Sequence, residues 1–386
     1  MSESMSISQT VRGVVTVAVR RGPSYFGYLA HGVMWPRASY ELSWGPRAPA
    51  IAQGVFAAVA EWSGGLVPRE VAEAARLVAA PGAQPAAGVG VKEIETLMDS
   101  AHRLGITGLD RAFTTVVRTT DGSLRFADLS DARRYPPGSV RFLASRDRDR
   151  VEFNTRFGAD LMTEKKARQA IATRKAAVPQ GYRDYAPIDF GGGLTVGQIA
   201  STDSGTGRWD FFNADVVTPL VQGKRVIDLG SNNGSLPLMM ARAGAEKVLG
   251  IEGTPAIADF ARLNAQILAW RDIRNYDLQI RTGDMRLFLT EDLGSFEVVT
   301  AFCSLYYLPE PDMAAVMRKA ASMGAVLILQ ANDAIDNLPA KREDLSRLMG
   351  ENGYPSATIY APPGFARPLL VGIPTPGHLR RGAGVQ

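Results

Sequence analysis

The sequence predicts an α/β protein, with a seven-stranded and mainly parallel sheet in its second half and an additional α+β domain before it. Three observations lead to this prediction. From about Tyr185 onward, short β-branched runs alternate with amphipathic helical stretches, which is typical of a parallel sheet covered on both faces. A glycine-rich turn joins the first of these runs to a helix, and an acid ends the second run. Finally, 386 residues with 46% hydrophobic content are enough for two cores.

The strands of the expected sheet are short apolar runs, and amphipathic helices fill the crossovers between them. No helical stretch separates the last two runs, so they should form a hairpin around the Pro-Pro-Gly turn at residues 362–364. The expected strands are residues 225–229, 247–251, 278–281, 297–301, 325–330, 358–361 and 369–373. The expected helices are residues 235–243, 255–270, 311–322 and 341–352.

The turn after the first strand carries the most informative motif of the chain, an Asp-x-Gly-x-x-x-Gly pattern formed by Asp228, Gly230 and Gly234. Without a Cβ atom, Gly230 can adopt a positive φ, and Gly234 lets the loop close over a nucleoside. Unpaired amides at the start of the following helix can bind a carboxylate. Glu252 ends the second strand, where an acid can accept hydrogen bonds from both hydroxyls of a ribose.

A dinucleotide site is the rival interpretation of a glycine-rich turn followed by an acid. Such a site holds a pyrophosphate and needs the tighter Gly-x-Gly-x-x-Gly spacing. In this chain Gly230 and Gly234 are four residues apart, which gives a wider loop that suits a zwitterionic amino-acid group better than a diphosphate. The sequence therefore favours a ligand that joins an amino acid to a nucleoside.

These motifs resemble the S-adenosylmethionine site of class I methyltransferases, whose sheet is Rossmann-like and ends in an antiparallel strand. The resemblance implies that Asp228 faces the amino-acid end of the donor and Glu252 its ribose. Asp284 lies where the family places an acid against the adenine amino group, although a helix N-cap is the plainer interpretation. Asn232 and Asn233 could contact the methionine moiety or serve only as turn formers. The cofactor-binding residues that this resemblance predicts are Asp228, Gly230, Ser231, Asn232, Asn233, Gly234, Glu252, Gly253, Asp284, Met285 and Cys303.

The loop after the fourth strand, residues 301–309, is where the methyl group and its acceptor should meet. Methyl transfer is an in-line displacement, so positioning and exclusion of water can supply most of the acceleration. Tyr306 and Tyr307 are the candidate catalytic residues, because a phenol can hydrogen-bond an acceptor and an aromatic ring can face a cation. Two adjacent aromatic residues can equally be core anchors. Cys303 is expected to be a buried, inert thiol, since the Pro-Cys pair of pyrimidine carbon-5 methylation is missing.

Residues 205–212, around Trp209, lead into the glycine motif and extend the likeness. The arrangement resembles tRNA wobble-uridine carboxymethyltransferases and their relatives, whose loop after the fourth strand ends in Leu-Tyr-His. Here Tyr307 replaces that histidine, so the resemblance supports donor binding and leaves the carboxymethyl substrate open. Trp209 is expected to be a hydrophobic staple of its helix rather than a contact with the acceptor. A small metabolite or glycan, methylated on an O, N or C nucleophile, is the first expected acceptor, and tRNA is the alternative partner.

The first half of the chain is expected to be an accessory domain that selects the substrate. Its residues 105–110 and 127–130 resemble the catalytic loop and metal-binding aspartate of protein and lipopolysaccharide kinases. Gly108 stands where that family has histidine and Thr115 where it has the metal-binding asparagine, so phosphoryl transfer is not expected. The block is therefore a degenerate kinase-like lobe or an unrelated substrate-shaping domain. The expected domains are residues 1–183 and 184–376, followed by a short tail at residues 377–386.

The composition of the chain is that of an ordinary soluble protein. Its net charge of +4 is mild, so a polyanionic partner is permitted but not required. Cys303 is the single cysteine, which rules out an internal disulfide, and the three histidines show no metal-ligand spacing. Because the sequence has no apolar run of membrane length and no signal-peptide pattern, a cytoplasmic protein is expected. The chain shows no obvious catalytic base, so a module that binds the donor without catalysis is the remaining alternative class.

Overall fold

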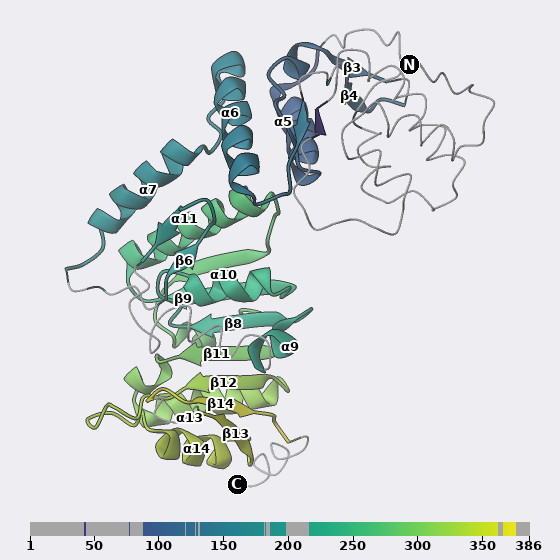
Figure 1. Cartoon of the computed structure of the whole chain (residues 1–386). Helices are drawn as coiled ribbons and strands as arrows, with labels where there is room; N and C mark the ends of the chain where they lie inside the picture. The colour runs from purple at the N-terminus through teal and green to yellow at the C-terminus, as the bar shows by residue number, and fades with distance from the viewer. Residues whose placement is uncertain are drawn as a thin grey trace, which may run out of the picture. The chain divides into compact units, whose positions relative to one another are not determined.

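The chain divides into two compact units, Met1–Lys166 and Ala167–Gln386, whose elements are labelled in Figure 1. Several predicted features lie outside the described residues, namely the segment around Trp209, the turn at residues 362–364, Asp128 and both chain ends. The domain boundary expected after residue 183 stays a prediction. The computed structural model describes residues 88–119, 121–127, 132–180, 186–197, 216–361 and 366–375, single residues 77, 129 and 182, and the backbone of Leu42–Ser43.

Seven strands form one sheet in the second unit, and they are β8 (Arg225–Leu229), β9 (Lys247–Glu252), β10 (Leu278–Thr282), β11 (Val298–Phe302), β12 (Val326–Gln330), β13 (Ala357–Tyr360) and β14 (Leu369–Gly372). Their order across the sheet is β10-β9-β8-β11-β12-β14-β13 (Figure 1). Strand β14 runs antiparallel to β12 and β13, and the remaining pairings are parallel. The predicted seven-stranded sheet and its terminal hairpin are therefore confirmed, with each strand end within one residue of its expected position.

Helices fill the crossovers of this sheet. Four of them were expected from their periodicity, and α9, α12 and the 3-10 turn were not, because a single turn is too short to show a helical period. Each of the four expected helices ends within two residues of its predicted bounds. The helical elements are α9 (Thr218–Val221), α10 (Ser235–Arg242), α11 (Pro255–Asp272), α12 (Leu287–Thr290), η3 (Leu305–Tyr307), α13 (Glu310–Ser322) and α14 (Arg342–Glu351).

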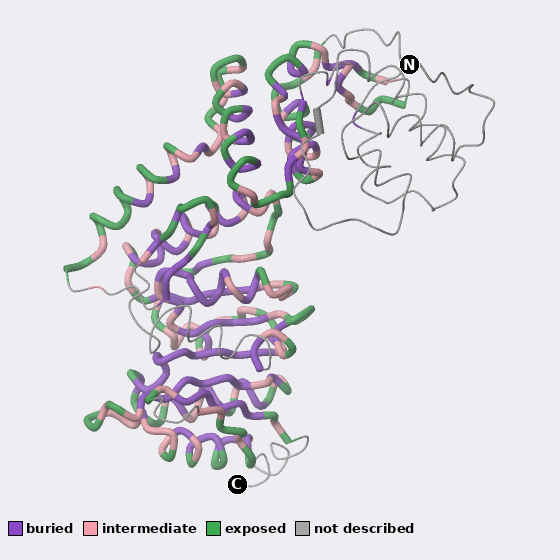
Figure 2. Tube along the Cα trace, in the orientation of Figure 1, coloured by how far each residue is buried: buried purple, intermediate pink, exposed green. Residues whose placement is uncertain are grey.

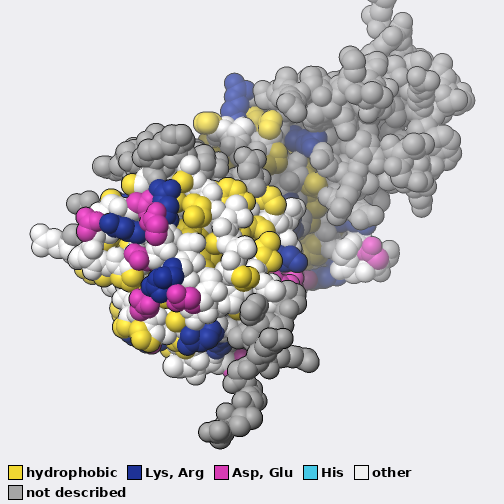
Figure 3. Space-filling model, turned by 90° about the horizontal axis from the view of Figure 1, so that it is seen from below, with side chains coloured by type: hydrophobic (Ala, Val, Ile, Leu, Met, Phe, Trp, Pro, Cys, Tyr) yellow, Lys and Arg dark blue, Asp and Glu magenta, His cyan; other side chains and the backbone are white. Residues whose placement is uncertain are grey.

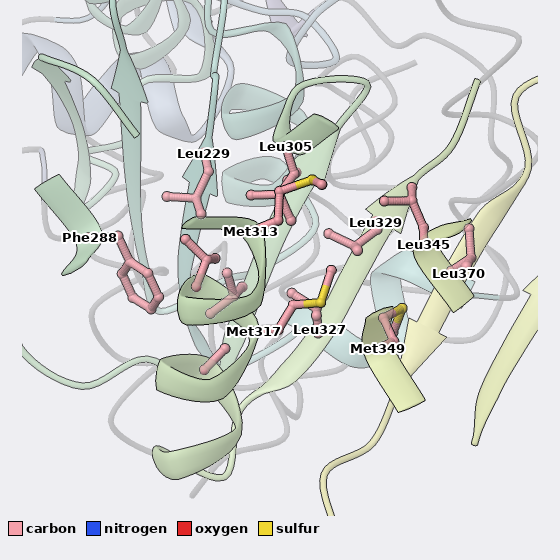
Figure 4. Close-up of a cluster of buried hydrophobic side chains, with 14 of the residues drawn as sticks. Leu229, Phe288, Leu305, Met313, Met317, Leu327, Leu329, Leu345, Met349 and Leu370 are labelled. Atoms are coloured by element: carbon pink, nitrogen blue, oxygen red, sulfur yellow. The ribbon is translucent and has the colours of Figure 1, made fainter. Parts of the chain in front are cut away.

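The sheet is buried between two helical layers, and alternate residues of a strand face opposite layers. Leu229 of β8 packs in the cluster that α13 covers with Met313 and Met317 (Figure 4). Val226 of the same strand packs in a second cluster, with Met240 of α10. All residues of β11 are buried, and the central strands run through the interior of this unit, whereas the edge strands β10 and β13 are partly exposed (Figure 2). The loops at the strand ends therefore stand on a rigid scaffold.

In its described residues, the first unit consists of short strands and two long helices. Strands β3 and β4 form an antiparallel hairpin, and Gly122, which lies between them in the sequence, has a φ of +81°. The core includes Phe113 and Phe153, whose rings meet edge to face at 5.4 Å. Its described elements are β1 (Leu42–Ser43), α5 (Val91–Arg103), β2 (Ile106–Thr107), η1 (Ala112–Thr114), β3 (Val116–Arg118), β4 (Leu124–Phe126), β5 (Arg133–Arg134) and α6 (Val140–Phe157), and α7 (Glu164–Ala176) crosses the boundary between the units.

Charged side chains are interspersed on the face of the second unit that carries α14. Arg347 pairs with Glu310 of α13 at 3.2 Å and with Glu351 at 3.0 Å. Seen from that side, basic and acidic side chains lie next to one another (Figure 3). This face therefore offers neither sign of charge preferentially. In the described part of the chain, no helix combines the length and apolar character needed to cross a membrane.

Candidate functional site

The predicted donor-binding residues come from the carboxyl ends of adjacent parallel strands. Strand β8 lies between β9 and β11. The strands that follow β8 are therefore added first toward one edge of the sheet and then, from β11 on, toward the other edge. At such a switch point the loops that follow the strands separate and leave room for a ligand. The turn after Leu229, Glu252 at the end of β9 and the loop after Phe302 therefore lie at one edge of the sheet.

The turn after β8 contains the left-handed Gly230 that the sequence predicts, and Gly234 is left-handed as well. Gly230 has a φ of +82° and Gly234 a φ of +81°. The backbone amides of Gly230 and Ser231 both donate to the Ile251 carbonyl at 2.9 Å, which ties the turn to β9. A Cβ atom on Gly230 would come within 2.5 Å of the Ser304 Cβ. Close packing against the loop after β11 thus requires glycine at this position.

A pair of glycine substitutions tests this packing. We expect Gly230→Ala to destabilise the protein by the left-handed backbone term of about 1 to 2 kcal/mol, plus about 1 to 3 kcal/mol for the contact with Ser304. Gly294→Ala is the matched control, because Gly294 has a φ of +83° and open space around its Cβ position. Urea denaturation measures both free energies of unfolding. Equal losses in the two variants would show that the contact with Ser304 costs nothing.

Glu252 is held at the end of β9 by two backbone amides and is 9% exposed. Its Oε2 accepts a hydrogen bond from the Asn232 amide and its Oε1 from the Thr254 amide, both at 2.9 Å. These bonds fix both oxygens while each oxygen keeps a further lone pair. The carboxylate is therefore oriented and retains acceptor capacity, as the predicted contact with ribose hydroxyls requires.

Asp228 is 1% exposed and lies one residue before the end of β8. Its Oδ1 accepts a hydrogen bond from the Thr300 hydroxyl of β11 at 2.6 Å. Burial raises the pKa of Asp228 to about 7, the Thr300 hydrogen bond opposes this rise, and the charge of Glu252 adds to it. The carboxyl group thus changes its charge near neutral pH, and a cationic ligand group beside it would favour the ionised form.

The side chains of Ser231 and Asn233 are turned into the fold. Asn233 is fully buried, its Oδ1 accepts a hydrogen bond from the Ser235 amide at 3.1 Å, and its carbonyl accepts one from Asn264 at 2.9 Å. The Ser231 hydroxyl is buried against Gly250 and has no hydrogen-bond partner in the part of the chain that the structure describes. Asn233 therefore stabilises the start of α10, as expected for a turn former. Its predicted contact with the donor stays a prediction.

Asp284 begins the turn that leads into α12. Its Oδ1 accepts a hydrogen bond from the Arg286 amide at 2.8 Å, and its Oδ2 lies 3.2 Å from the Arg286 guanidinium. The N-cap of α12 is Arg286, so the plainer interpretation of Asp284 as a helix N-cap is wrong; its side chain instead stabilises the turn before the helix. Its side chain is 56% exposed and keeps room for a second partner. Gly253 is exposed as well. The Met285 sulfur lies 3.6 Å from the Cβ position of Gly230, beside the turn at residues 230–234, which is called the donor turn below.

The loop after β11 presents one tyrosine to solvent and buries the other. Cys303 is buried in a left-handed conformation, with a φ of +55°, and its thiol donates to Gln330 Oε1 at 3.3 Å. Tyr306 is 1% exposed and Tyr307 is 57% exposed, with ring centroids 4.9 Å apart. Burial, together with the neighbouring Cys303, raises the pKa of Tyr306, so its phenol stays neutral at physiological pH. Tyr307 is the accessible candidate for contact with an acceptor.

One residue at this site has no signal in the sequence. The Tyr182 hydroxyl donates to Asn232 Oδ1 at 2.7 Å, so a residue from before the sheet contacts the donor turn. The two residues are separated by 50 positions, and neither a motif nor a periodic pattern connects them. Only the folded chain brings them together.

In the first unit, hydrogen bonds to a residue of α6 hold the turn at residues 105–110, which resembles a kinase catalytic loop. Asp149 of α6 accepts hydrogen bonds from the Gly108 amide at 3.0 Å, the Leu109 amide at 2.8 Å and His102 at 3.0 Å. Asp110, the next residue of the turn, lines an open pocket of about 610 Å³. Asp128 stands where the resembled kinases have their metal-binding aspartate, and it lies outside the described residues. The kinase-like likeness therefore stays a prediction.

Known protein families and relatives match the part of the chain that contains this site. Residues 226–324 match the family described as "Methyltransferase domain". The chain is 36% identical over 103 residues to a ubiquinone biosynthesis O-methyltransferase of Neisseria meningitidis serogroup C (strain 053442), a match that covers 27% of this chain and 40% of the relative. The protein of the same name from Xanthomonas campestris pv. campestris (strain B100) is 32% identical over 116 residues, which are 30% of this chain and 44% of the relative. The chain thus spans less than half the length of these curated relatives.

Solved structures that are similar to part of this chain include the following two. One is the magnesium protoporphyrin IX methyltransferase from Synechocystis PCC 6803 with bound S-adenosylmethionine, with 23% identity, a TM-score of 0.34, and coverage of 44% of this chain and 77% of that chain. The other is the N-terminal domain of EvdMO1 in the presence of S-adenosylhomocysteine and D-fucose, with 18% identity, a TM-score of 0.38, and coverage of 55% and 98%.

The family match, the strand order and the motifs at the carboxyl edge of the sheet define the class of this segment. It is a class I methyltransferase domain with a Rossmann-like sheet. S-adenosylmethionine is the methyl donor of this class. The likeness to tRNA wobble-uridine carboxymethyltransferases and the individual donor-binding roles remain predictions.

Proposed function

We propose that the whole chain is an S-adenosylmethionine-dependent methyltransferase that methylates a small metabolite or glycan. The observation that supports this most strongly is the conjunction at one sheet edge of the left-handed Gly230 turn with the carboxylates of Asp228 and Glu252. An amino acid joined to a nucleoside offers an ammonium group and two ribose hydroxyls, and these carboxylates provide matching acceptors. An oxygen nucleophile is the first candidate acceptor, because the relatives that match this segment are named O-methyltransferases.

The residues of this chain would act mainly by binding and orientation. The donor supplies a methyl group on a sulfonium, and its transfer breaks the carbon–sulfur bond, forms the bond to the acceptor atom, leaves S-adenosylhomocysteine and releases the acceptor's proton. Asp228 and Glu252 would hold the donor's charged and hydroxyl groups. Tyr307, exposed on the loop after β11, would hydrogen-bond the acceptor. This loop contains no carboxylate or imidazole, so alignment and exclusion of water would provide most of the acceleration.

Release of S-adenosylhomocysteine tests the proposed activity. The purified protein is incubated with methyl-labelled donor and a metabolite extract, with a second sample treated first with ribonuclease. We expect labelled small molecules and S-adenosylhomocysteine in both samples. Label that appears only in RNA and vanishes after ribonuclease would favour the tRNA alternative. Donor binding without any product, over extracts from several growth conditions, would favour a non-catalytic binding module.

Tyr307→Phe tests the part assigned to the acceptor loop. Removal of one hydrogen bond to the acceptor should slow turnover by about fivefold to tenfold, the effect of about 1 to 1.4 kcal/mol. Donor affinity should not change, because the exposed ring remains in place. Product release measures the rate, and calorimetry with S-adenosylhomocysteine measures the affinity. An unchanged rate would restrict Tyr307 to a packing role against Tyr306.

A further inference from the structure

Two hydrogen bonds fix the side chain of Asn232, which lies in the turn at residues 230–234 that is expected to bind the methyl donor. Its Oδ1 accepts from the Tyr182 hydroxyl at 2.7 Å and from the Asn233 amide at 2.8 Å. Asn232 has a φ of +50°, a left-handed conformation that asparagine tolerates better than most residues. The same residue donates its own backbone amide to Glu252 Oε2 at 2.9 Å. A continuous set of hydrogen bonds therefore connects Tyr182, Asn232 and Glu252.

These contacts determine which way the Asn232 carboxamide points. An atom that receives a hydrogen bond from a backbone N–H must be the oxygen, because an amide nitrogen has no lone pair to accept it. The NH2 group of Asn232 is consequently directed away from Asn233. It donates to no residue in the described part of the chain, and the side chain is only half-buried. Two oriented N–H donors are thus available on the residue whose backbone amide donates to Glu252 Oε2.

We propose that Asn232 Nδ2 donates to an oxygen of the bound donor and that Tyr182 is the positioning residue that holds this amide in place. The oxygen is a ribose hydroxyl or the carboxylate of the amino-acid moiety, since both are acceptors that Glu252 itself cannot satisfy. This inference rests on the proposed function. It adds Tyr182, a residue from outside the glycine motif, to the donor site and identifies the atom through which Asn232 would contact the ligand.

Calorimetric titrations with S-adenosylhomocysteine and with adenosine test this assignment. Tyr182→Phe keeps the ring and removes the hydroxyl, and it should weaken S-adenosylhomocysteine binding by about threefold to tenfold. Asn232→Asp still accepts from Tyr182 and Asn233 but lacks the N–H donors, and it should weaken binding by about tenfold or more. The matched control is Tyr276→Phe, which removes an equivalent 2.7 Å bond to Asp272 at the opposite end of the sheet, before β10. The affinity of Tyr276→Phe for S-adenosylhomocysteine should equal that of the wild type.

The two ligands distinguish the two possible oxygens. If Asn232→Asp weakens adenosine and S-adenosylhomocysteine alike, the partner is the ribose, and if it weakens only S-adenosylhomocysteine, the partner is the carboxylate. In a double-mutant comparison, Tyr182→Phe should have no further effect once Asn232 is alanine, which a merely structural tyrosine would not show. Wild-type affinity in both Tyr182→Phe and Asn232→Asp would overturn the inference. Failure of the wild type to bind either ligand would instead contradict the proposed function. Should Tyr182→Phe fail to fold, Asn232→Asp decides alone.

Discussion

Glu252→Ala should weaken the binding of S-adenosylmethionine by about a hundredfold or more. Each charge-assisted hydrogen bond from a ribose hydroxyl to the carboxylate contributes about 1.5 to 3 kcal/mol, and two such bonds are expected. The substitution also leaves the amides of Asn232 and Thr254 without the acceptor that now orders them. Binding energy and the shape of the donor turn are therefore lost together. Calorimetry with the donor and with S-adenosylhomocysteine measures the change.

The matched control for this substitution lies at the other end of the sheet. Glu297 also accepts from a backbone amide, that of Arg225 at 2.9 Å, but it does so where β8 and β11 begin. Glu297→Ala should therefore lower stability without changing donor affinity. A Glu252→Ala protein that remains folded and binds the donor within about twofold of the wild type would show that the ribose contact is wrongly assigned.

Asp228→Asn should make the ligand-free protein more stable at pH 8 and less able to bind the donor. The folded-state pKa of Asp228 is raised from 3.8 to about 7. An acid with a raised pKa contributes most to stability below its unfolded pKa, and that stability is lost as pH rises toward the folded pKa. At about 1.4 kcal/mol per pKa unit, the free energy of unfolding of Asp228→Asn, relative to that of the wild type, should be about 3 kcal/mol higher at pH 8 than at pH 5.

Urea denaturation at pH 5 and pH 8 measures this difference. Asp292→Asn, in an exposed loop where Asp292 accepts from the Gly294 amide, is the matched control and should follow the pH dependence of the wild type. Donor affinity should also increase in the wild type as Asp228 ionises, and this increase should disappear in Asp228→Asn. If the free energies of unfolding of the wild type and Asp228→Asn change equally between pH 5 and pH 8, then burial of the ionised Asp228 carboxylate does not destabilise the protein.

The strands and long helices could be predicted from the sequence because their signals are local. The apolar run at β8 indicates a strand buried on both faces, the period of α11 indicates a helix buried on one face, and both elements lie where the sequence predicts them. The left-handed conformation of Gly230 could also be predicted locally, since a tight turn between strand and helix needs glycine. The single-turn elements α12 and η3 have no such period and were missed.

The parts of the site that depend on tertiary contact could not be predicted. Nothing in the spacing indicates that Tyr182 contacts Asn232 or that Thr300 donates to Asp228. The adjacent residues Tyr306 and Tyr307 look equivalent in the sequence, yet one is buried and the other is exposed. Burial and hydrogen bonding, which set both pKa values and accessibility, arise from elements far apart in the chain.

Crystals grown with S-adenosylmethionine would show directly whether the turn after Leu229 binds the methyl donor. We expect the nucleoside to lie over this turn, with its ribose against Glu252 and its ammonium group toward Asp228. An empty turn at saturating concentration, or a nicotinamide dinucleotide bound there in preference, would contradict it.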